Sequence, residues 1–144
     1  HLNGEAVKLM GVEWTAGSNP DHGFAEPESL IRAMGLLMKE VNCIFSRQHF
    51  QQGDVFFDFC DRHGILVQQE VPLWGPETPA NDTMQRIALR QLQRMVDNYR
   101  NHPSIFAWGV GNELRARGNM NTTHRASVMH KYVSCAEQLT DFGQ

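Results

Sequence analysis

Short, mostly apolar runs alternate along the chain with segments of amphipathic helical periodicity, and this alternation constrains the fold more than any other feature. The expected strands cover residues 7–12, 42–46, 65–70 and 105–110. Helices are expected from near Pro27, over 55–63, from Asp82 and from near Thr123. Because strands with almost continuous apolar runs are covered on both faces, this repeated order predicts a parallel α/β sheet.

Several residues are expected to mark the ends and faces of these helices. Pro27 suits the first turn of the first helix, and Asp54 and Asp82 suit N-cap positions. Gly64 is expected just after the second helix, where the backbone turns left-handed. The apolar spacing predicts that the first helix packs through Leu30, Met34, Leu37, Met38 and Val41.

Two architectures share this order of strands and helices. The length of 144 residues suits a flavodoxin-like doubly wound domain, whereas a complete (β/α)8 barrel needs about 250 residues. The second architecture is therefore a partial (β/α)8 TIM barrel of about the first four βα units. A strand order 1-2-3-4 would indicate the barrel, and an order 2-1-3-4 would indicate the doubly wound sheet.

Charge and residue spacing argue against several classes of function. The net charge of −3, from 16 acidic and 13 basic residues, predicts no nucleic-acid partner. No run of about 18 apolar residues is present, so no membrane-spanning helix is expected. The three cysteines and seven histidines lack the spacing of a disulfide framework or a zinc site, so we expect buried thiols and no metal site.

Polar and aromatic side chains follow each expected strand, where parallel α/β folds bind their ligands. In chain order they are Glu13, Trp14, His49, Glu70, Trp74, Asn112 and Glu113. Carboxylates can move protons, amide and imidazole groups can bond hydroxyls, and indole rings can cover the apolar face of a sugar. The strand ends therefore predict a carbohydrate site.

Glu113 is the strongest catalytic candidate. It follows a mostly apolar strand, where burying a charge is unfavourable unless it serves a purpose. Apolar surroundings would keep its carboxyl group protonated, as the acid catalyst of a glycosidase requires. The spacing alone leaves a structural role open, in which Glu113 caps the next loop or pairs with Arg115.

The remaining candidates include both substrate-binding and structural roles. His49 either bonds a substrate hydroxyl or is a partly buried structural histidine. Glu70 is expected to form a structural salt bridge with an arginine such as Arg47. Trp14 and Trp74 are candidate sugar platforms. The residues expected to bind substrate are Glu13, His49, Trp74 and Asn112.

The longest motif in the chain is NHPSIFAWGVGNE, over residues 101–113. It resembles the acid/base signature of glycoside hydrolase family 2, which holds β-galactosidases, β-glucuronidases and β-mannosidases. Three earlier segments resemble the same family in the same order: residues 3–12, the pair His49 and Phe50, and CDRHGILV over 60–67. Glu70 matches the family's glutamate at the end of the third strand.

The resemblance implies a fold and a mechanism. Residues 1–144 would form the N-terminal half of a TIM-barrel catalytic domain. Glu113 would be the general acid/base of a retaining β-glycosidase, Asn112 would bond the hydroxyl beside the anomeric carbon, and His49 would line the sugar pocket. The nucleophile of the family is a second glutamate, which would lie beyond this sequence.

The resemblance also implies the partners. The substrate is a carbohydrate and no cofactor is expected, because two carboxylates and water suffice for hydrolysis. The other partner is the rest of the same chain, comprising the second barrel half and β-sandwich domains. The 144-residue chain alone is expected to be inactive, and it is expected to dimerise or aggregate through its open strand edges.

Two positions depart from the family pattern. Ser46 stands three residues before His49, where the family usually has an arginine, and Arg47 follows it. Trp74, Gly75 and Pro76 stand where magnesium-dependent β-galactosidases have Glu-Thr-His, so no magnesium site is expected. A non-catalytic carbohydrate-binding or degenerate barrel is the alternative function.

Overall fold

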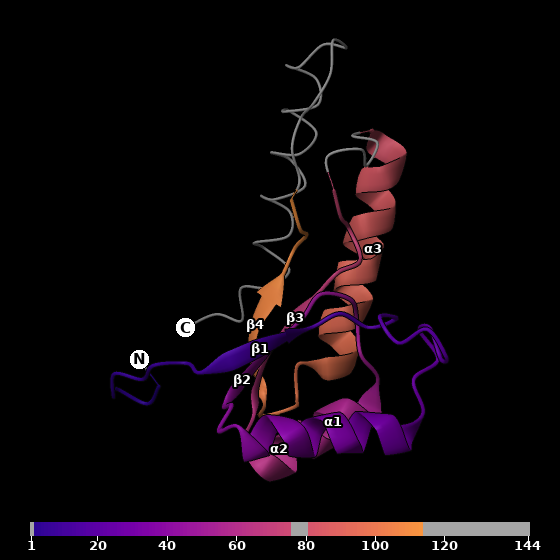
Figure 1. The fold of residues 1–144 in the computed structure, drawn as a ribbon. Helices are drawn as coiled ribbons and strands as arrows, with labels where there is room; N and C mark the ends of the chain where they lie inside the picture. Colours follow the sequence, from indigo (N-terminus) through magenta and orange to yellow (C-terminus); the bar gives the residue numbers. More distant parts are fainter. Residues whose placement is uncertain (1, 76–80, 114–144) are drawn as a thin grey trace. The chain divides into compact units, whose positions relative to one another are not determined.

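In the computed structural model, residues 2–75 and 81–113 are described. Along the chain they form the elements β1 (Gly11–Trp14), α1 (Glu28–Glu40), β2 (Phe45–Gln48), α2 (Asp54–His63), β3 (Leu66–Glu70), α3 (Asp82–Tyr99) and β4 (Ile105–Gly109) (Figure 1). The strict alternation of strand and helix is as expected. The helix expected from near Thr123 lies outside the described residues.

The strands form one sheet in the order β1-β2-β3-β4. β1 pairs parallel with β2 in the register Glu13 to Arg47, and β2 pairs parallel with β3 in the register Gln48 to Gln69. A doubly wound sheet would place its first strand between the second and the third, so this order rejects the flavodoxin-like alternative. The partial (β/α)8 barrel is confirmed.

The chain divides into two compact units. Unit one comprises His1–Gln69 and His102–Ala107, and unit two comprises Glu70–Asn101 and Trp108–Gln144. Unit one holds β1, β2, most of β3 and the first part of β4. Unit two holds the end of β3, α3 and the end of β4.

The core of unit one is aromatic and centres on α2. Phe56 and Phe57 of this helix are completely buried. Ile65 and Val67, which follow α2 in the chain, are completely buried as well. Trp14 packs edge-on against Phe56, with ring centroids 5.6 Å apart. Trp14 is only 6% exposed, so the prediction that it is a sugar platform is wrong, because its indole is buried in the core.

α1 packs through a stripe that shares Met38 with the expected one and otherwise differs from it. The buried residues are Ile31, Gly35 and Met38. Three residues expected to pack are instead exposed, by 36%, 52% and 65%: Met34, Leu37 and Val41. The reason is Gly35, because a Cβ at this position would overlap the ring of Phe59, and its absence lets α1 approach α2 closely along the glycine side.

The helix ends follow the expected chemistry, with shifts of one residue. Gly64 adopts the left-handed conformation after α2, with φ 66° and ψ 46°, as predicted. Pro27 and Gly53 are the N-caps of α1 and α2, so Asp54 is the first helical residue and not the cap. Asn81, not Asp82, caps α3, and its Oδ1 accepts the backbone N–H of Met84 at 2.9 Å.

In unit two, α3 buries one side of its length. The buried residues are Ala88, Leu92, Met95, Val96 and Tyr99. Within residues 2–75 and 81–113, we find no helix that is both long enough and apolar enough to cross a membrane.

Candidate active site

In unit one, the ends of β1 and β2 bring together two residues expected to bind substrate, Glu13 and His49. The parallel register places Glu13 opposite Arg47, and Arg47 donates to Glu13 Oε2 at 2.6 Å. The other carboxylate oxygen of Glu13 lies 3.8 Å from Nδ1 of His49. The carboxylate of Glu13 therefore lies between the guanidinium of Arg47 and the imidazole of His49, at the ends of β1 and β2.

Arg47 has a partner that the sequence did not indicate, and the expected salt bridge between Glu70 and an arginine such as Arg47 stays a prediction. Its hydrogen-bonded ion pair with Glu13 was not foreseen, because a sequence does not show which strands are in register. Neighbouring residues of a strand face opposite sides of the sheet, so Ser46, which is completely buried, faces away from this pair. The one-residue displacement of the arginine from the family position thus places its charge on the face that carries Glu13.

Glu26 also belongs to this region, although it was not among the residues expected from the sequence. Its Oε1 accepts the indole N–H of Trp14 at 3.3 Å, and its Oε2 accepts the side-chain amide of Gln52 at 3.0 Å. Glu26 thereby ties the end of loop 15–27 to the end of β1 and to the segment after β2. A glutamate just before a helix is common, because its negative charge is favourable near the helix N-terminus. The sequence therefore does not indicate that Glu26 contacts Trp14 and Gln52.

In unit two, Glu70 ends β3 in a buried position, with an exposure of 2%. Gly109 of β4 makes room for it, because a Cβ at Gly109 would lie 2.8 Å from both Cγ and Oε2 of Glu70. The backbone continues this contact, since the N–H of Val71 donates to the carbonyl of Gly109 at 3.0 Å. The glycine of the sequence motif is therefore a steric requirement of the Glu70 side chain.

Strand pairing in unit two extends past β3 and β4 to the expected site residues. Trp74 and Asn112 form an isolated parallel bridge. Asn112 donates its N–H to the carbonyl of Leu73 at 2.9 Å, and its carbonyl accepts the N–H of Gly75 at 2.9 Å. Asn112 is thus fixed by its backbone, and the Trp74 side chain next to it is 55% exposed.

Glu113 directly follows Asn112 and has an unusual backbone. Its φ of 53° lies in the left-handed region, which a residue with a long side chain rarely adopts. Such conformations concentrate at functional sites. The side chain is exposed in the described part of the chain, so the apolar walls expected around it stay a prediction. Arg115, its alternative partner, lies outside that part.

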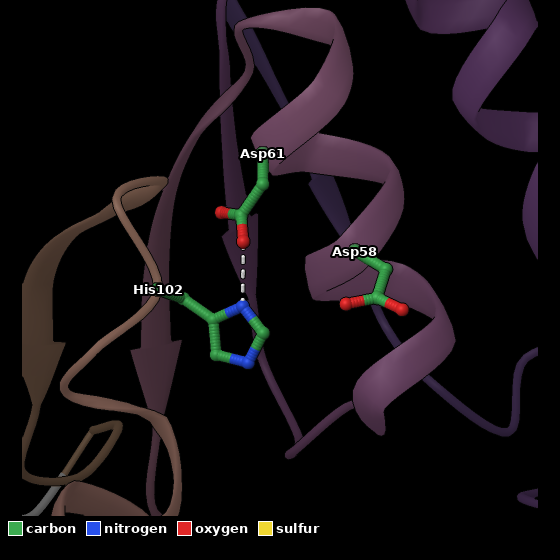
Figure 2. A group of neighbouring side chains, drawn as sticks. All are labelled: Asp58, Asp61 and His102. Atoms are coloured by element: carbon green, nitrogen blue, oxygen red, sulfur yellow. Dashed lines mark hydrogen bonds and ion pairs between the residues drawn. The ribbon is translucent and has the colours of Figure 1, made fainter.

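Asp61, His102 and Ser104, which come from two segments of the family motif, form a clasp in unit one. His102 Nδ1 lies 2.7 Å from Asp61 Oδ2 (Figure 2). The N–H of Ser104 donates to Asp61 Oδ1 at 3.0 Å. Burial raises the pKa of Asp61, but the hydrogen bonds from Ser104 and His102 outweigh it, so the pKa lies below its usual value. These motif residues join α2 to the turn before β4.

The same clasp includes the group most suited to a metal ion in the described chain. Ligand atoms of Asp58, Asp61 and His102 lie within 4.8 Å of one another. Both oxygens of Asp61 already accept hydrogen bonds, and Asp58 also lies 3.9 Å from Arg62. Hydrogen bonds to Asp61 and the ion pair of Asp58 with Arg62 therefore account for this cluster.

The two described cysteines are buried thiols with a packing role. Cys43 and Cys60 are free and buried, as expected, and Cys135 lies outside the described residues. Burial, with a contribution from the negative charge of Asp61, raises the pKa of the Cys60 thiol to about 12. A thiol in this state is a packing group.

The order of the motifs, the parallel strands and the placement of the strand-end residues agree with a comparison of the whole sequence. The family model for the glycosyl hydrolases family 2 TIM barrel domain matches residues 1–133. The chain belongs to glycosyl hydrolase family 2.

Relatives of this family 2 chain include both β-galactosidases and β-glucuronidases. A β-galactosidase of Thermoanaerobacter pseudethanolicus is 35% identical over 112 residues, which cover 76% of this chain and 15% of that protein. A β-glucuronidase of Bacteroides fragilis is 32% identical over 131 residues, which cover 82% of this chain and 18% of that protein.

Solved structures of family 2 enzymes share the fold. A β-glucuronidase of Parabacteroides merdae matches with a TM-score of 0.80 and 27% identity, over 96% of this chain and 18% of that chain. The family 2 chain therefore spans less than a fifth of the length of these relatives. The roles of Glu13, His49, Trp74, Asn112 and Glu113 stay predictions.

Proposed function

We propose that this chain is part of a retaining β-glycosidase in which Glu113 is the general acid/base. The observation that carries this proposal is the backbone of Glu113, which holds a left-handed φ of 53° directly after the bridged residue Asn112. A left-handed backbone is strained for glutamate, and such strain concentrates at functional sites, where it can aim a side chain at the reacting group. The position is also the one at which the family motif ends.

The proposed reaction has two steps. Glu113 donates its proton to the glycosidic oxygen while a carboxylate from outside this sequence attacks the anomeric carbon. The bond to the leaving group breaks and a covalent glycosyl-enzyme forms. Glu113, now a carboxylate, takes a proton from water as the water oxygen attacks the anomeric carbon. The bond between that carbon and the nucleophile carboxylate breaks, which releases the sugar in its original configuration and regenerates both carboxyl groups.

The substrate-binding residues follow from the strand ends. Asn112 would bond the hydroxyl beside the anomeric carbon, and Trp74 offers an indole that is 55% exposed. His49 would donate or accept a hydrogen bond with another hydroxyl, with Glu13 and its partner Arg47 orienting the imidazole. Because the relatives include β-galactosidases and β-glucuronidases, we propose a β-galactoside or a β-glucuronide as substrate.

The test is the substitution Glu113→Gln in the complete protein. For a glycoside with a poor leaving group, kcat/KM should fall about 10²–10⁴-fold, because the leaving oxygen receives no proton. For an activated nitrophenyl glycoside, glycosyl-enzyme formation should fall far less. Steady-state rates with both substrates and pre-steady-state release of nitrophenol measure the two effects.

Glu40→Gln is the matched control, because Glu40 is an exposed glutamate at the end of α1. It should leave both rates unchanged. Unaltered turnover of the poor substrate by the Glu113 variant would refute the assignment. Sugar binding by the wild type without any hydrolysis would instead indicate the non-catalytic alternative.

A further inference from the structure

Three rings of unit one form a continuous aromatic ledge, defined as Phe24, Phe50 and His49. The His49 and Phe50 rings are stacked, with centroids 4.6 Å apart and planes inclined by 14°. Phe24 meets Phe50 edge-on, with centroids 5.7 Å apart and an angle of 79°. The ledge therefore runs from the histidine expected to contact the sugar to a ring on loop 15–27.

The outermost ring of this ledge is strongly exposed. Phe24 has an exposure of 75%, the largest of the big apolar side chains in the described residues. A phenyl ring left in water forgoes much of the free energy that burial would supply. The structure thus presents an apolar surface directly beside polar sugar-binding candidates.

Phe24 is nevertheless held in place. Gly17, with a φ of 84°, lies against its ring so closely that a Cβ there would approach ring atoms to 2.9 Å. The N–H of Gly23, just before Phe24, donates to the carbonyl of Asn19 at 2.9 Å. Two residues after Phe24, Glu26 anchors the loop through Trp14 and Gln52. An exposed ring in a fixed position loses little conformational entropy when a ligand covers it.

We propose that the aromatic ledge binds the leaving group of the glycoside through an apolar ring face. This inference rests on the proposed function, because it takes His49 to contact the sugar itself. The ligand chemistry follows from the rings: an aromatic face favours a partner that is flat or has axial C–H groups on one side. Phe24 is the specificity-determining residue, since its ring is the part of the ledge that is open to a ligand.

Two sources could supply this ring, an apolar alcohol or a second sugar. Cyclohexyl and phenyl β-glycosides probe the first source, and the corresponding disaccharides probe the second. Isopropyl β-glycosides are the reference, because isopropanol and cyclohexanol are secondary alcohols of similar acidity and only one carries a ring. All substrates are made with galactose and with glucuronic acid.

The experiment measures kcat/KM of the complete protein and its Phe24→Ala variant for this panel. For cyclohexyl and phenyl glycosides, Phe24→Ala should lower kcat/KM about tenfold, from the loss of one buried ring face. For the isopropyl glycosides the ratio of variant to wild type should stay near one. A tenfold loss with disaccharides as well would assign the ledge to both sources.

Phe24→Tyr should keep most of the preference, because it retains the ring. Leu36→Ala is the matched surface control, since Leu36 is an exposed apolar residue of α1. If Phe24→Ala lowers the rates of all substrates equally, or of none, the proposal for the ledge is wrong. The proposed glycosidase function is unaffected by that outcome. If the wild type hydrolyses no member of the panel, the proposed function fails and the ledge proposal fails with it.

Discussion

Gly109 and Glu70 show how one missing methyl group can shape a site. A Cβ on Gly109 would lie within 2.8 Å of Glu70, whose side chain is only 2% exposed and has little room to move. Overpacking of this kind typically destabilises a fold because neighbouring side chains leave their preferred rotamers. The pair sits at the ends of β3 and β4, just before Trp74 and Asn112.

We predict that Gly109→Ala lowers the free energy of unfolding of the complete protein by about 1–3 kcal/mol. Denaturant titration of the wild type and the variant measures the change. A double-mutant cycle with Glu70→Ala provides the control: if the clash is with Glu70, the effect of Gly109→Ala shrinks when that side chain is truncated. Equal effects in both backgrounds would contradict the steric explanation.

At the scale of elements, loop 15–27 is attached to the sheet by one carboxylate. Trp14 and Gln52 are both buried, and each directs a side-chain N–H to Glu26. A buried donor without an acceptor is unfavourable by about 1–3 kcal/mol. Glu26 therefore stabilises the loop and holds it to the end of β1 and to the segment after β2.

We predict that Glu26→Ala lowers the free energy of unfolding by about 1–3 kcal/mol. We also expect it to raise KM more than it lowers kcat, because the loop that carries Phe24 loses its anchor. The control is Glu28→Ala, two residues away: Glu28 makes only an exposed pair with Arg32, so the loss should stay below about 1 kcal/mol. Equal losses in the two variants would contradict a special role for Glu26.

The elements themselves were largely predictable, and their exact edges were not. β1 begins at Gly11, four residues after the expected start at residue 7, and includes Glu13. The expectation followed the apolar run, whereas pairing with β2 requires backbone in register and accepts polar side chains. The same limit applies to α1, whose apolar side chains fit two stripes until Gly35 and Phe59 select one.

At the scale of the whole molecule, the clasp of Asp61 joins segments that are 41 and 43 residues apart. The pKa of Asp61 is lower in the folded protein than in the unfolded chain, so the carboxylate form favours folding. This contribution is fully present above the unfolded pKa of about 3.9 and is lost as the pH falls through the lower folded value.

We predict that the wild type loses more stability than Asp61→Asn when the pH of the complete protein is lowered from 6 towards 3, as about half of unfolded aspartates are protonated near pH 3.9. At pH 6 the variant should already be the less stable of the two. Denaturant titrations at a series of pH values measure both differences. If the free energy of unfolding falls equally with pH in the two proteins, the lowered pKa of Asp61 in the folded protein is contradicted.

The sequence by itself determined the alternation of strands and helices, the family, the left-handed Gly64 and the residues that follow the strands. These features depend on neighbouring residues or on a contiguous motif, so they are visible in one dimension. Only the tertiary structure decided that Arg47 pairs with Glu13, that Trp14 is buried, and that Glu26 and Phe24 belong to the site region. Each of these features depends on which distant segments of the chain come together. Such contacts form, and contribute free energy, only when the chain folds.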